Sequence, residues 1–218
     1  MDIRVDQHTA IAFDLDDTLY NEIEFLKSAY ASIARELDPD NWRALYILMF
    51  SLYRSKLDVF DIIGRKYKAD KEALIQKYRH HRPDIQLFEG ALEVIRQIKN
   101  KKGRIAIITD GRKVTQMNKI HALGLADLVD EIVISEAIGT EKPHEKNFKV
   151  LHEALNLDVY YYIADNLKKD FITPRSLGWQ TIGIVDNGLN IHFENYKYLD
   201  GKHEPHQYFS TYKELRII

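Results

Sequence analysis

Acidic residues follow two of the apolar runs in this chain. In the segment IAFDLDDTLY, residues 11–20, Asp14 and Asp16 end the first run, and Asp165 ends a later one, with Asp170 close behind. If these carboxylates meet, their mutual repulsion is costly unless a divalent cation neutralises it. A site rich in carboxylate oxygens and without His or Cys suits Mg²⁺ best, so we expect magnesium there.

Other polar residues stand at comparable positions. Thr109, Asp110 and Gly111 end another apolar run, and Lys142 directly precedes Pro143 in the segment GTEKPHEKNF. We expect Pro143 to begin a helix, because proline is favoured in the first helical turn. Since chemistry collects beyond the carboxyl ends of parallel strands, a parallel sheet would bring this hydroxyl, this cation and the acids together.

The elements that would position these residues follow an α/β pattern. Runs rich in Ile, Val, Phe and Tyr alternate with helix-period segments, which is typical of a parallel sheet flanked by helices. The strand-like runs are TAIAFDL, GRIAIIT, DEIVIS, YYYIAD and QTIGIVD. We also expect a helix over EGALEVIRQIKNKKG that ends at Gly103, and a last short strand and closing helix in YFSTYKELRII.

The spacing between the first two strands is abnormally long. Residues 21–87 read as several consecutive helices instead of one crossover, which predicts an inserted helical domain. The chain would then have a Rossmann-like core formed by residues 1–20 and 88–218, and a helical-bundle cap formed by residues 21–87.

The inserted segment carries its own helix signals. We expect Asp38 or Asp40 to cap a helix with Pro39 in its first turn, Gly64 to break a helix, and Asp70 to cap the next one. The aromatic side chains of NWRALYILMFSLYRSK are expected to build mainly the core of this bundle, and QKYRHHRP to form a solvated face near the hinge.

Composition narrows the classes of protein. The 31 Lys and Arg nearly balance the 33 Asp and Glu, which argues against a nucleic-acid partner, and the chain has no Cys for disulfides or thiolate metal sites. The longest apolar stretch, ALYILMFSLY, is shorter than the roughly 20 residues of a membrane-spanning helix. With no signal-peptide pattern at the N-terminus, we expect a soluble cytoplasmic protein.

Four short patterns in order along the chain resemble the motifs of the haloacid dehalogenase superfamily of phosphohydrolases. These are a strand followed by D-L-D-D-T-L, a strand followed by T-D-G, then E-K-P, and a strand followed by A-D-x-x-x-x-D, from about Ile11 to Val185. The resemblance implies a Rossmann-like core whose first strand lies between the second and the fourth. It also implies a helical cap inserted after the first motif.

The resemblance assigns a role to each matching residue. Asp14 would be the nucleophile that forms an aspartyl-phosphate, and Asp16 the general acid and base. Residues two apart in a strand point the same way, so both carboxylates can face one phosphoryl group. Thr109, with the backbone N–H groups of Asp110 and Gly111, would hold the phosphoryl oxygens.

The remaining motif residues would neutralise charge. Lys142 would offset the charge of the phosphoryl group and the nucleophile. Asp165, Asp14 and the main-chain carbonyl of Asp16 would be the magnesium ligands, and Asp170 would orient metal-bound water or Lys142.

Two positions depart from the usual family motifs. Asp110 replaces the usual Asn, and this added acid would disfavour highly anionic substrates. Ala164 replaces the usual Gly before the fourth-motif Asp, which should perturb little. The acid at Asp16 favours a phosphatase over a dehalogenase, because a halide leaves without needing a proton.

We therefore expect a magnesium-dependent phosphomonoester hydrolase that acts on a small phosphorylated metabolite such as a sugar phosphate, a nucleoside monophosphate or flavin mononucleotide. One alternative is a phosphorylatable receiver protein, although the strand EIVIS does not end in the Asp that a receiver needs there. The other is a non-catalytic binding protein on the same fold.

Several polar residues have simpler interpretations. Asp17 and Thr18 are better explained as caps of the turn after the first strand than as catalytic groups. His192, His203 and His206 have irregular spacing and no nearby Cys, so we expect a solvated loop there instead of a metal site.

Overall fold

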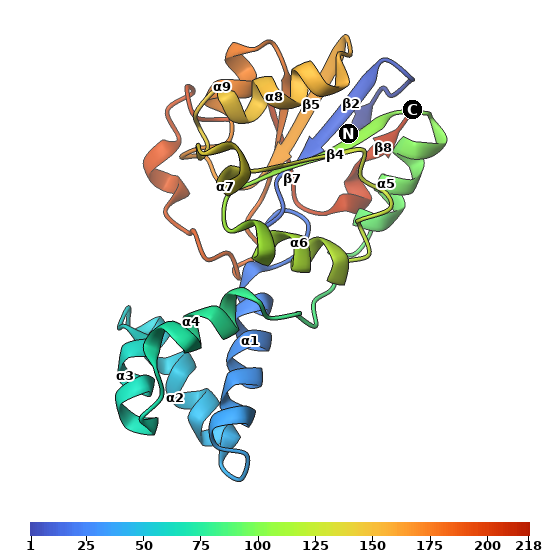
Figure 1. Ribbon diagram of the computed structural model, residues 1–218. Coiled ribbons are helices and arrows are strands. Elements are labelled where there is room, and N and C mark those ends of the chain that lie inside the picture. The colour runs from blue at the N-terminus through green and yellow to red at the C-terminus, as the bar shows by residue number, and fades with distance from the viewer.

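The computed structural model describes residues 1–218, with a six-stranded parallel sheet at its centre (Figure 1). The strand order is β4-β3-β2-β5-β6-β7. The strands are β2 (Thr9–Phe13), β3 (Arg104–Thr109), β4 (Glu131–Ile134), β5 (Val159–Ala164), β6 (Gln180–Ile184) and β7 (Gln207–Phe209). The α/β prediction is confirmed, and β2 lies between β3 and β5 as expected.

The central strand β2 is buried on both faces, which explains its unbroken apolar sequence. Ile11 and Phe13 belong to the apolar cluster on one face, where α5 (Ala91–Asn100) and α6 (Lys113–Ala122) pack. Ala10 and Ala12 belong to the cluster on the other face, with α8 (Lys146–Leu155). The remaining core helices are short, namely α7 (Ser135–Ile138) and α9 (Ile172–Ser176).

The C-terminal segment differs in part from the prediction. The expected last strand is β7, but the expected closing helix is a single 3₁₀ turn, η2 (Tyr212–Glu214). Thr211 and Glu214 cap this turn reciprocally, and the chain then continues into β8 (Arg216–Ile217), which pairs with β1 (Asp2–Ile3). Another 3₁₀ turn, η1 (Asn195–Tyr198), lies in the long connection between β6 and β7.

Two helix boundaries in the core also differ from the prediction. Helix α5 ends at Asn100 instead of Gly103, because Lys102 already has left-handed backbone geometry. At Gly103 an added Cβ would lie 2.5 Å from Cγ1 of Val5, so close packing explains this glycine. Pro143 does not begin a helix: α8 starts at Lys146, and the carbonyl of Pro143 accepts a hydrogen bond from Thr173 on α9.

Four consecutive helices occupy most of the inserted segment and form a separate group in Figure 1. They are α1 (Glu22–Leu37), α2 (Trp42–Arg54), α3 (Val59–Tyr67) and α4 (Lys71–Arg79). Their buried side chains, among them Tyr30, Leu45 and Met49, form an apolar cluster of their own. We propose on this basis that residues 21–87 are a cap on a core of residues 1–20 and 88–218.

The helix signals of this group were only partly right. Asp70 caps α4 as expected and accepts a hydrogen bond from the Ala73 N–H at 2.8 Å. Neither Asp38 nor Asp40 caps α2, whose N-cap residue is Asn41. Asp38 instead ends α1, where its carboxylate accepts hydrogen bonds from the Asn41 N–H and the Tyr67 hydroxyl.

Two further points concern the same helices. Pro39 lies in the turn between α1 and α2, outside the first turn of either helix. Gly64 does not break a helix but lies within α3, where an added Cβ would come 2.8 Å from the Ala69 carbonyl oxygen. A close approach of backbone explains this glycine. No helix in the structure combines the length and the apolar character that crossing a membrane requires.

Candidate active site

A cavity of about 230 Å³ lies at the carboxyl ends of β2, β3 and β5. Six of the residues selected from the sequence line it, namely Asp14, Asp16, Thr109, Asp110, Gly111 and Asp165. The other two, Lys142 and Asp170, do not line the cavity but are buried beside it, where Lys142 contacts both Asp14 and Asp170. The topology therefore brings all eight residues together.

Lys142 lies between two carboxylates. Its Nζ atom is 2.8 Å from Oδ1 of Asp14 and 2.7 Å from Oδ1 of Asp170, and it donates to the Tyr162 hydroxyl at 3.0 Å. Burial acts to lower the pKa of Lys142, but Asp14 and Asp170 outweigh it and raise that pKa well above its ordinary value. The lysine therefore stays charged beside Asp14.

Three buried acids meet next to this lysine. Carboxylate oxygens of Asp14, Asp165 and Asp170 all lie within 4.8 Å of one another. Burial raises the pKa of Asp14 to about 6, against the opposing charge of Lys142. Burial and the charges of Asp14 and Asp170 raise the pKa of Asp165 well above its ordinary value. One lysine does not balance three acids, and an all-carboxylate set of this kind fits a divalent cation such as Mg²⁺.

Asp170 uses both of its oxygens within the protein. Oδ1 contacts Lys142 and accepts from the Tyr162 hydroxyl at 3.2 Å, while Oδ2 accepts from the Asn166 N–H at 3.1 Å. This arrangement suits a residue that orients Lys142, which is one of the two roles that the family resemblance implies, the other being to orient metal-bound water.

Asp16 has surroundings that the sequence did not suggest. Lys119 of α6 contacts both of its oxygens, at 2.7 and 2.8 Å, Gln116 donates to Oδ2 at 2.9 Å, and the Tyr20 hydroxyl donates to Oδ1. Burial acts to raise the pKa of Asp16, but Lys119 and these hydrogen bonds outweigh it and lower that pKa. Gln116 also donates to Oγ1 of Thr109 at 2.5 Å and so links the two motif residues.

Lys119 and Gln116 were missed because they lie outside all four motifs. The available signal was their spacing, since residues three apart lie on the same face of a helix. Both are polar, yet only 3% and 2% exposed, on the face of α6 that packs against the core. A charged side chain on a core-facing position needs a buried partner, which here is Asp16.

The unusual Asp110 is compensated locally. Its Oδ2 lies 2.8 Å from Nζ of Lys169, and its Oδ1 accepts a hydrogen bond from the Lys142 N–H at 3.0 Å. The Gly111 N–H, expected to face a phosphoryl group, donates here to Oγ of Ser135 at 2.9 Å. Lys169, at an unspecified position of the fourth motif, therefore balances the extra acid in the second motif.

Of the two residues expected to cap the turn after the first strand, Asp17 does so and Thr18 does not. Asp17 does cap the turn, because its oxygens accept hydrogen bonds from the N–H groups of Glu22 and Ile191 at 2.8 and 2.7 Å. Burial nevertheless raises the pKa of Asp17 to about 6. Thr18 does not cap; its hydroxyl donates to Oδ1 of Asp165 at 3.3 Å. Asp17 thus ties the start of the cap to the active-site loop.

The three histidines do not come together. His203 contacts Asp200 and His206 contacts Thr181, both away from the cavity. His192 is exposed, as predicted for a solvated loop, but it also lines the cavity. Its position beside the acids was not predicted.

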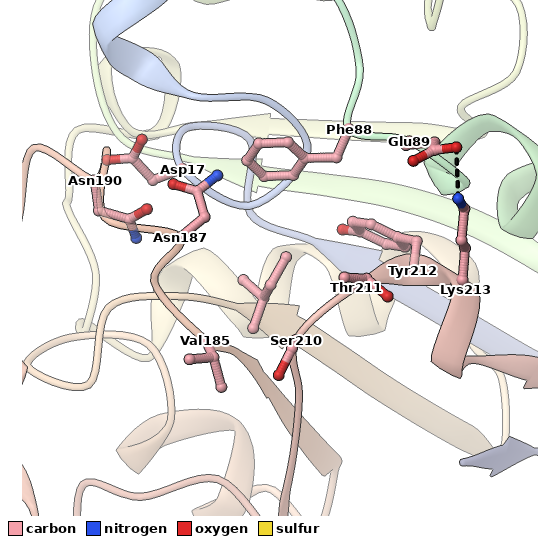
Figure 2. A pocket seen from close by; sticks show the side chains of 11 residues that line it. Asp17, Phe88, Glu89, Val185, Asn187, Asn190, Ser210, Thr211, Tyr212 and Lys213 are labelled. Carbon is pink, nitrogen blue, oxygen red and sulfur yellow. Dashed lines mark ion pairs between the residues drawn. The ribbon is translucent and has the colours of Figure 1, made fainter.

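A second cavity of about 220 Å³ adjoins the first and shares Asp17 with it (Figure 2). Phe88, Ile184 and Tyr212 supply apolar walls, and Asn187 and Asn190 supply amides. None of the eight selected residues lines this cavity.

Comparisons with known proteins agree with this geometry. Residues 11–184 match the family of haloacid dehalogenase-like hydrolases. The glyceraldehyde 3-phosphate phosphatase of Methanocaldococcus jannaschii is 28% identical over 201 residues, which covers 80% of this chain and 84% of the relative. The pyrophosphatase PpaX of Bacillus pumilus is 22% identical over 179 residues, covering 80% and 82%.

Solved structures show the same fold. The HAD-hydrolase YfnB of Bacillus subtilis, bound to magnesium, superimposes with a TM-score of 0.62 at 22% identity and covers 95% of this chain and 96% of its own. A predicted phosphoglycolate phosphatase of Haemophilus somnus gives a TM-score of 0.64 at 16% identity, with 95% and 96% covered. Because the family match spans most of the sequence and its motif residues converge on one cavity, the chain is an enzyme that belongs to the haloacid dehalogenase-like hydrolases.

Proposed function

We propose that this enzyme is a magnesium-dependent phosphatase that hydrolyses a small phosphomonoester through an aspartyl-phosphate on Asp14. The arrangement of Asp14 carries the proposal. One of its oxygens is held by Lys142, the other makes no hydrogen bond within the protein, and the residue lines a cavity beside Asp165. A buried carboxylate with one free oxygen suits in-line attack on phosphorus.

The residues divide the reaction into two steps. In the first, the Asp14 oxygen bonds to phosphorus, the bond from phosphorus to the leaving oxygen breaks, and Asp16 gives that oxygen a proton. In the second, water attacks the phosphorus atom while Asp16 takes a proton from that water, the bond from phosphorus to the Asp14 oxygen breaks, and inorganic phosphate and the Asp14 carboxylate are released. Lys142 offsets negative charge throughout.

Asp16 must change partners for these steps. Both of its oxygens accept hydrogen bonds from Lys119, Gln116 and Tyr20. Because these donors lower the pKa of Asp16, its carboxylate has to take up a proton from solvent and exchange one of these contacts for the leaving oxygen before it can act as an acid. Thr109, which already shares Gln116 with Asp16, would hold a phosphoryl oxygen.

Mg²⁺ would be held by Asp14, Asp165 and the main-chain carbonyl of Asp16, and when bound it supplies positive charge to the phosphoryl oxygens. The raised pKa values of Asp14 and Asp165, which follow from burial first and then from the charges of neighbouring acids, support this assignment. A cation lowers both pKa values and lets the two acids be ionised together.

Further acidic residues line the cavity, and they bear on which charge the leaving group of the substrate can carry. Glu22 and Glu141 line it without an ion-pair partner. Burial first, and then the charge of Asp16, raise the pKa of Glu22 to about 8, so this end of the cavity offers a second anion neither solvation by bulk water nor an unpaired cation. We therefore propose a leaving group without a second anion, such as a triose or another sugar, as in the names of the glyceraldehyde 3-phosphate phosphatase relatives.

No observation favours the alternative of a signalling receiver. The strand β4 ends at Ile134 and is followed by Ser135, so a phosphoacceptor Asp is missing from that position. A cytoplasmic location stays a prediction.

Phosphate release from p-nitrophenyl phosphate tests the reaction. We expect turnover with Mg²⁺, loss of turnover with a chelator, and no activity in Asp14→Asn at any Mg²⁺ concentration. Asp40→Asn changes an exposed acid on the cap and serves as the matched control with unchanged activity. Full activity in chelator would contradict the magnesium assignment, and turnover by Asp14→Asn would contradict the nucleophile.

A matched pair of substrates tests the leaving group. Glyceraldehyde 3-phosphate and 3-phosphoglycerate differ mainly in an aldehyde against a carboxylate. We expect kcat/KM to be at least about tenfold higher for the aldehyde, which corresponds to about 1.4 kcal/mol of discrimination. Equal or better use of the carboxylate would contradict the proposed substrate class.

A further inference from the structure

The loop after β6 contacts a proposed magnesium ligand. The amide Nδ2 of Asn190 donates to Oδ2 of Asp165 at 3.0 Å. Asn195, further along the same connection, donates to the main-chain oxygen of Asp165 at 3.1 Å. Neither asparagine belongs to the four sequence motifs, and both are distant from Asp165 in the chain.

Asp165 depends on neutral donors for its orientation. Its carboxylate makes no salt bridge: Oδ1 accepts from the Thr18 hydroxyl at 3.3 Å and Oδ2 accepts from Asn190 at the shorter distance of 3.0 Å. Asp165 is only 4% exposed and lies among other acids. A buried carboxylate in such surroundings needs donors that hold it in place.

The loop itself is well fixed where it presents Asn190. The next residue, Ile191, donates its N–H to Oδ2 of Asp17 at 2.7 Å and packs against the apolar cluster of the cap. The carboxylate of Asp186 accepts from the N–H of Gly188 at 2.7 Å and of Asn190 at 3.3 Å. Figure 2 shows Asn190, Asn187 and Asp17 grouped at one end of the second cavity.

We propose that Asn190 is a positioning residue for magnesium, which aims the Asp165 carboxylate at the cation. The proposal rests on the proposed function, because it takes Asp165 as a magnesium ligand. An amide suits this task better than a lysine would. It holds one oxygen by a hydrogen bond but adds no positive charge that would compete with Mg²⁺. Partners of this kind behind a metal ligand typically contribute about 10- to 100-fold in metal affinity.

Calorimetric titration of Mg²⁺ into the purified protein tests this role without relying on turnover. Asn190→Ala should raise the Kd for Mg²⁺ by about tenfold or more. Asn190→Leu keeps nearly the same side-chain volume but removes the donor, and it should give the same loss. Asn187→Ala is the matched control in the same loop, because Asn187 donates to Asn21 on the cap side and does not touch Asp165. Its Kd should stay within about twofold of the wild type.

The Mg²⁺ dependence of hydrolysis should distinguish the Asn190 variants from the wild type in the same way. The Mg²⁺ concentration for half-maximal hydrolysis of p-nitrophenyl phosphate should rise in both Asn190 variants by the factor seen in the Kd, with the rate at saturating Mg²⁺ within about threefold of the wild type. An unchanged Kd in both Asn190 variants, or an equal loss in Asn187→Ala, would overturn the positioning role while leaving the magnesium site intact. A wild-type protein that binds no Mg²⁺ would overturn the magnesium assignment and this inference together.

Discussion

Asp14 and Asp16 are the same type of residue two positions apart, but the protein surrounds them differently. Burial raises the pKa of Asp14 to about 6, although Lys142 opposes it. Lys119, Gln116 and Tyr20 together lower the pKa of Asp16 against the effect of burial. The two residues are therefore held by different partners and can take different parts in the reaction.

Replacing Asp16 separates the proposed role of Asp14 as nucleophile from that of Asp16 as acid and base. In Asp16→Ala, an aryl phosphate whose phenolate leaves without a proton should still phosphorylate Asp14, whereas alkyl phosphates should react far more slowly. Hydrolysis of the aspartyl-phosphate should then stall for lack of a base. Mass spectrometry should find one added phosphoryl group on the peptide that contains Asp14.

The double variant Asp14→Asn with Asp16→Ala is the control and should carry no added mass. A phosphoryl group on any other peptide would contradict the assignment of Asp14 as nucleophile. Rapid turnover of alkyl phosphates by Asp16→Ala would contradict the assignment of Asp16.

For individual residues, the sequence reveals those that belong to a motif. It does not reveal the residues outside the motifs that contact them in the folded protein. Asp14, Thr109, Lys142 and Asp165 were identified because order and spacing mark them. Lys119 and Asn190 reach the site from a helix face and from a loop, and nothing in their neighbouring residues indicates which acid each will meet. Such contacts depend on how the elements pack.

At the scale of elements, the carboxylate of Asp130 links the start of β4 to α5 and β3. Asp130 precedes β4, and its carboxylate accepts hydrogen bonds from Lys99 on α5 at 2.8 and 3.0 Å, from Arg104 on β3 at 2.9 Å, and from the Ile105 N–H at 2.8 Å. Burial acts to raise the pKa of Asp130, but these donors outweigh it and lower that pKa below its ordinary value. The junction thus favours the ionised acid.

Asp130→Asn should therefore lower the free energy of unfolding by about 1 kcal/mol at pH 7, as measured by urea denaturation. Because the pKa is lower in the folded state, this stability is present above the unfolded pKa of about 3.9 and is lost as the pH falls through the folded pKa. The difference between the wild type and the variant should shrink in that acidic range.

Asp127→Asn, at a nearby exposed position, is the control and should change the stability little at either pH. A difference between Asp130→Asn and the wild type that is the same at pH 7 and in acid would show that the charge of Asp130 contributes nothing.

The existence of the elements was more predictable than their ends. Five strands of the central sheet, β2 to β6, lie in apolar runs, and the insert follows from the distance between the first two of these strands. At the end of α1 the Asp38 carboxylate accepts a hydrogen bond from the Tyr67 hydroxyl, and ahead of α8 the Pro143 carbonyl accepts one from the Thr173 hydroxyl. The partners in these contacts are distant in the sequence, so the residues around a helix end do not reveal them.

At the scale of the whole molecule, the proposed cap and the proposed core meet at the candidate active site. The first residue of α1, Glu22, lines the cavity and donates its N–H to Asp17 of the core loop. Ile191 of the core packs against the cap cluster. A movement of the cap would therefore change the mouth of the cavity directly.

Hydrogen exchange should detect this movement. With beryllium fluoride as a phosphate analogue, we expect slower exchange of the amides in LYNEIEF and RPDIQL, the two segments that join the cap to the core. Helix α3, which is remote from both segments in sequence, serves as the internal reference. The same exchange with and without the analogue would contradict a cap that closes on the ligand.

The position of β2 also has a consequence for how the chain reaches its native state. Ile11 of this central strand pairs with Ile105 and with Tyr161, so both neighbours leave the ribosome long after it. The four helices α1 to α4 lie between β2 and β3 in the chain and can collapse on their own apolar cluster first. Lengthening a loop is thermodynamically mild, at about 0.6 kcal/mol for each doubling, but non-local strand pairing slows folding. During synthesis both edges of β2 therefore stay unpaired until β3 and β5 have been made, and unpaired strand edges expose a nascent chain to aggregation.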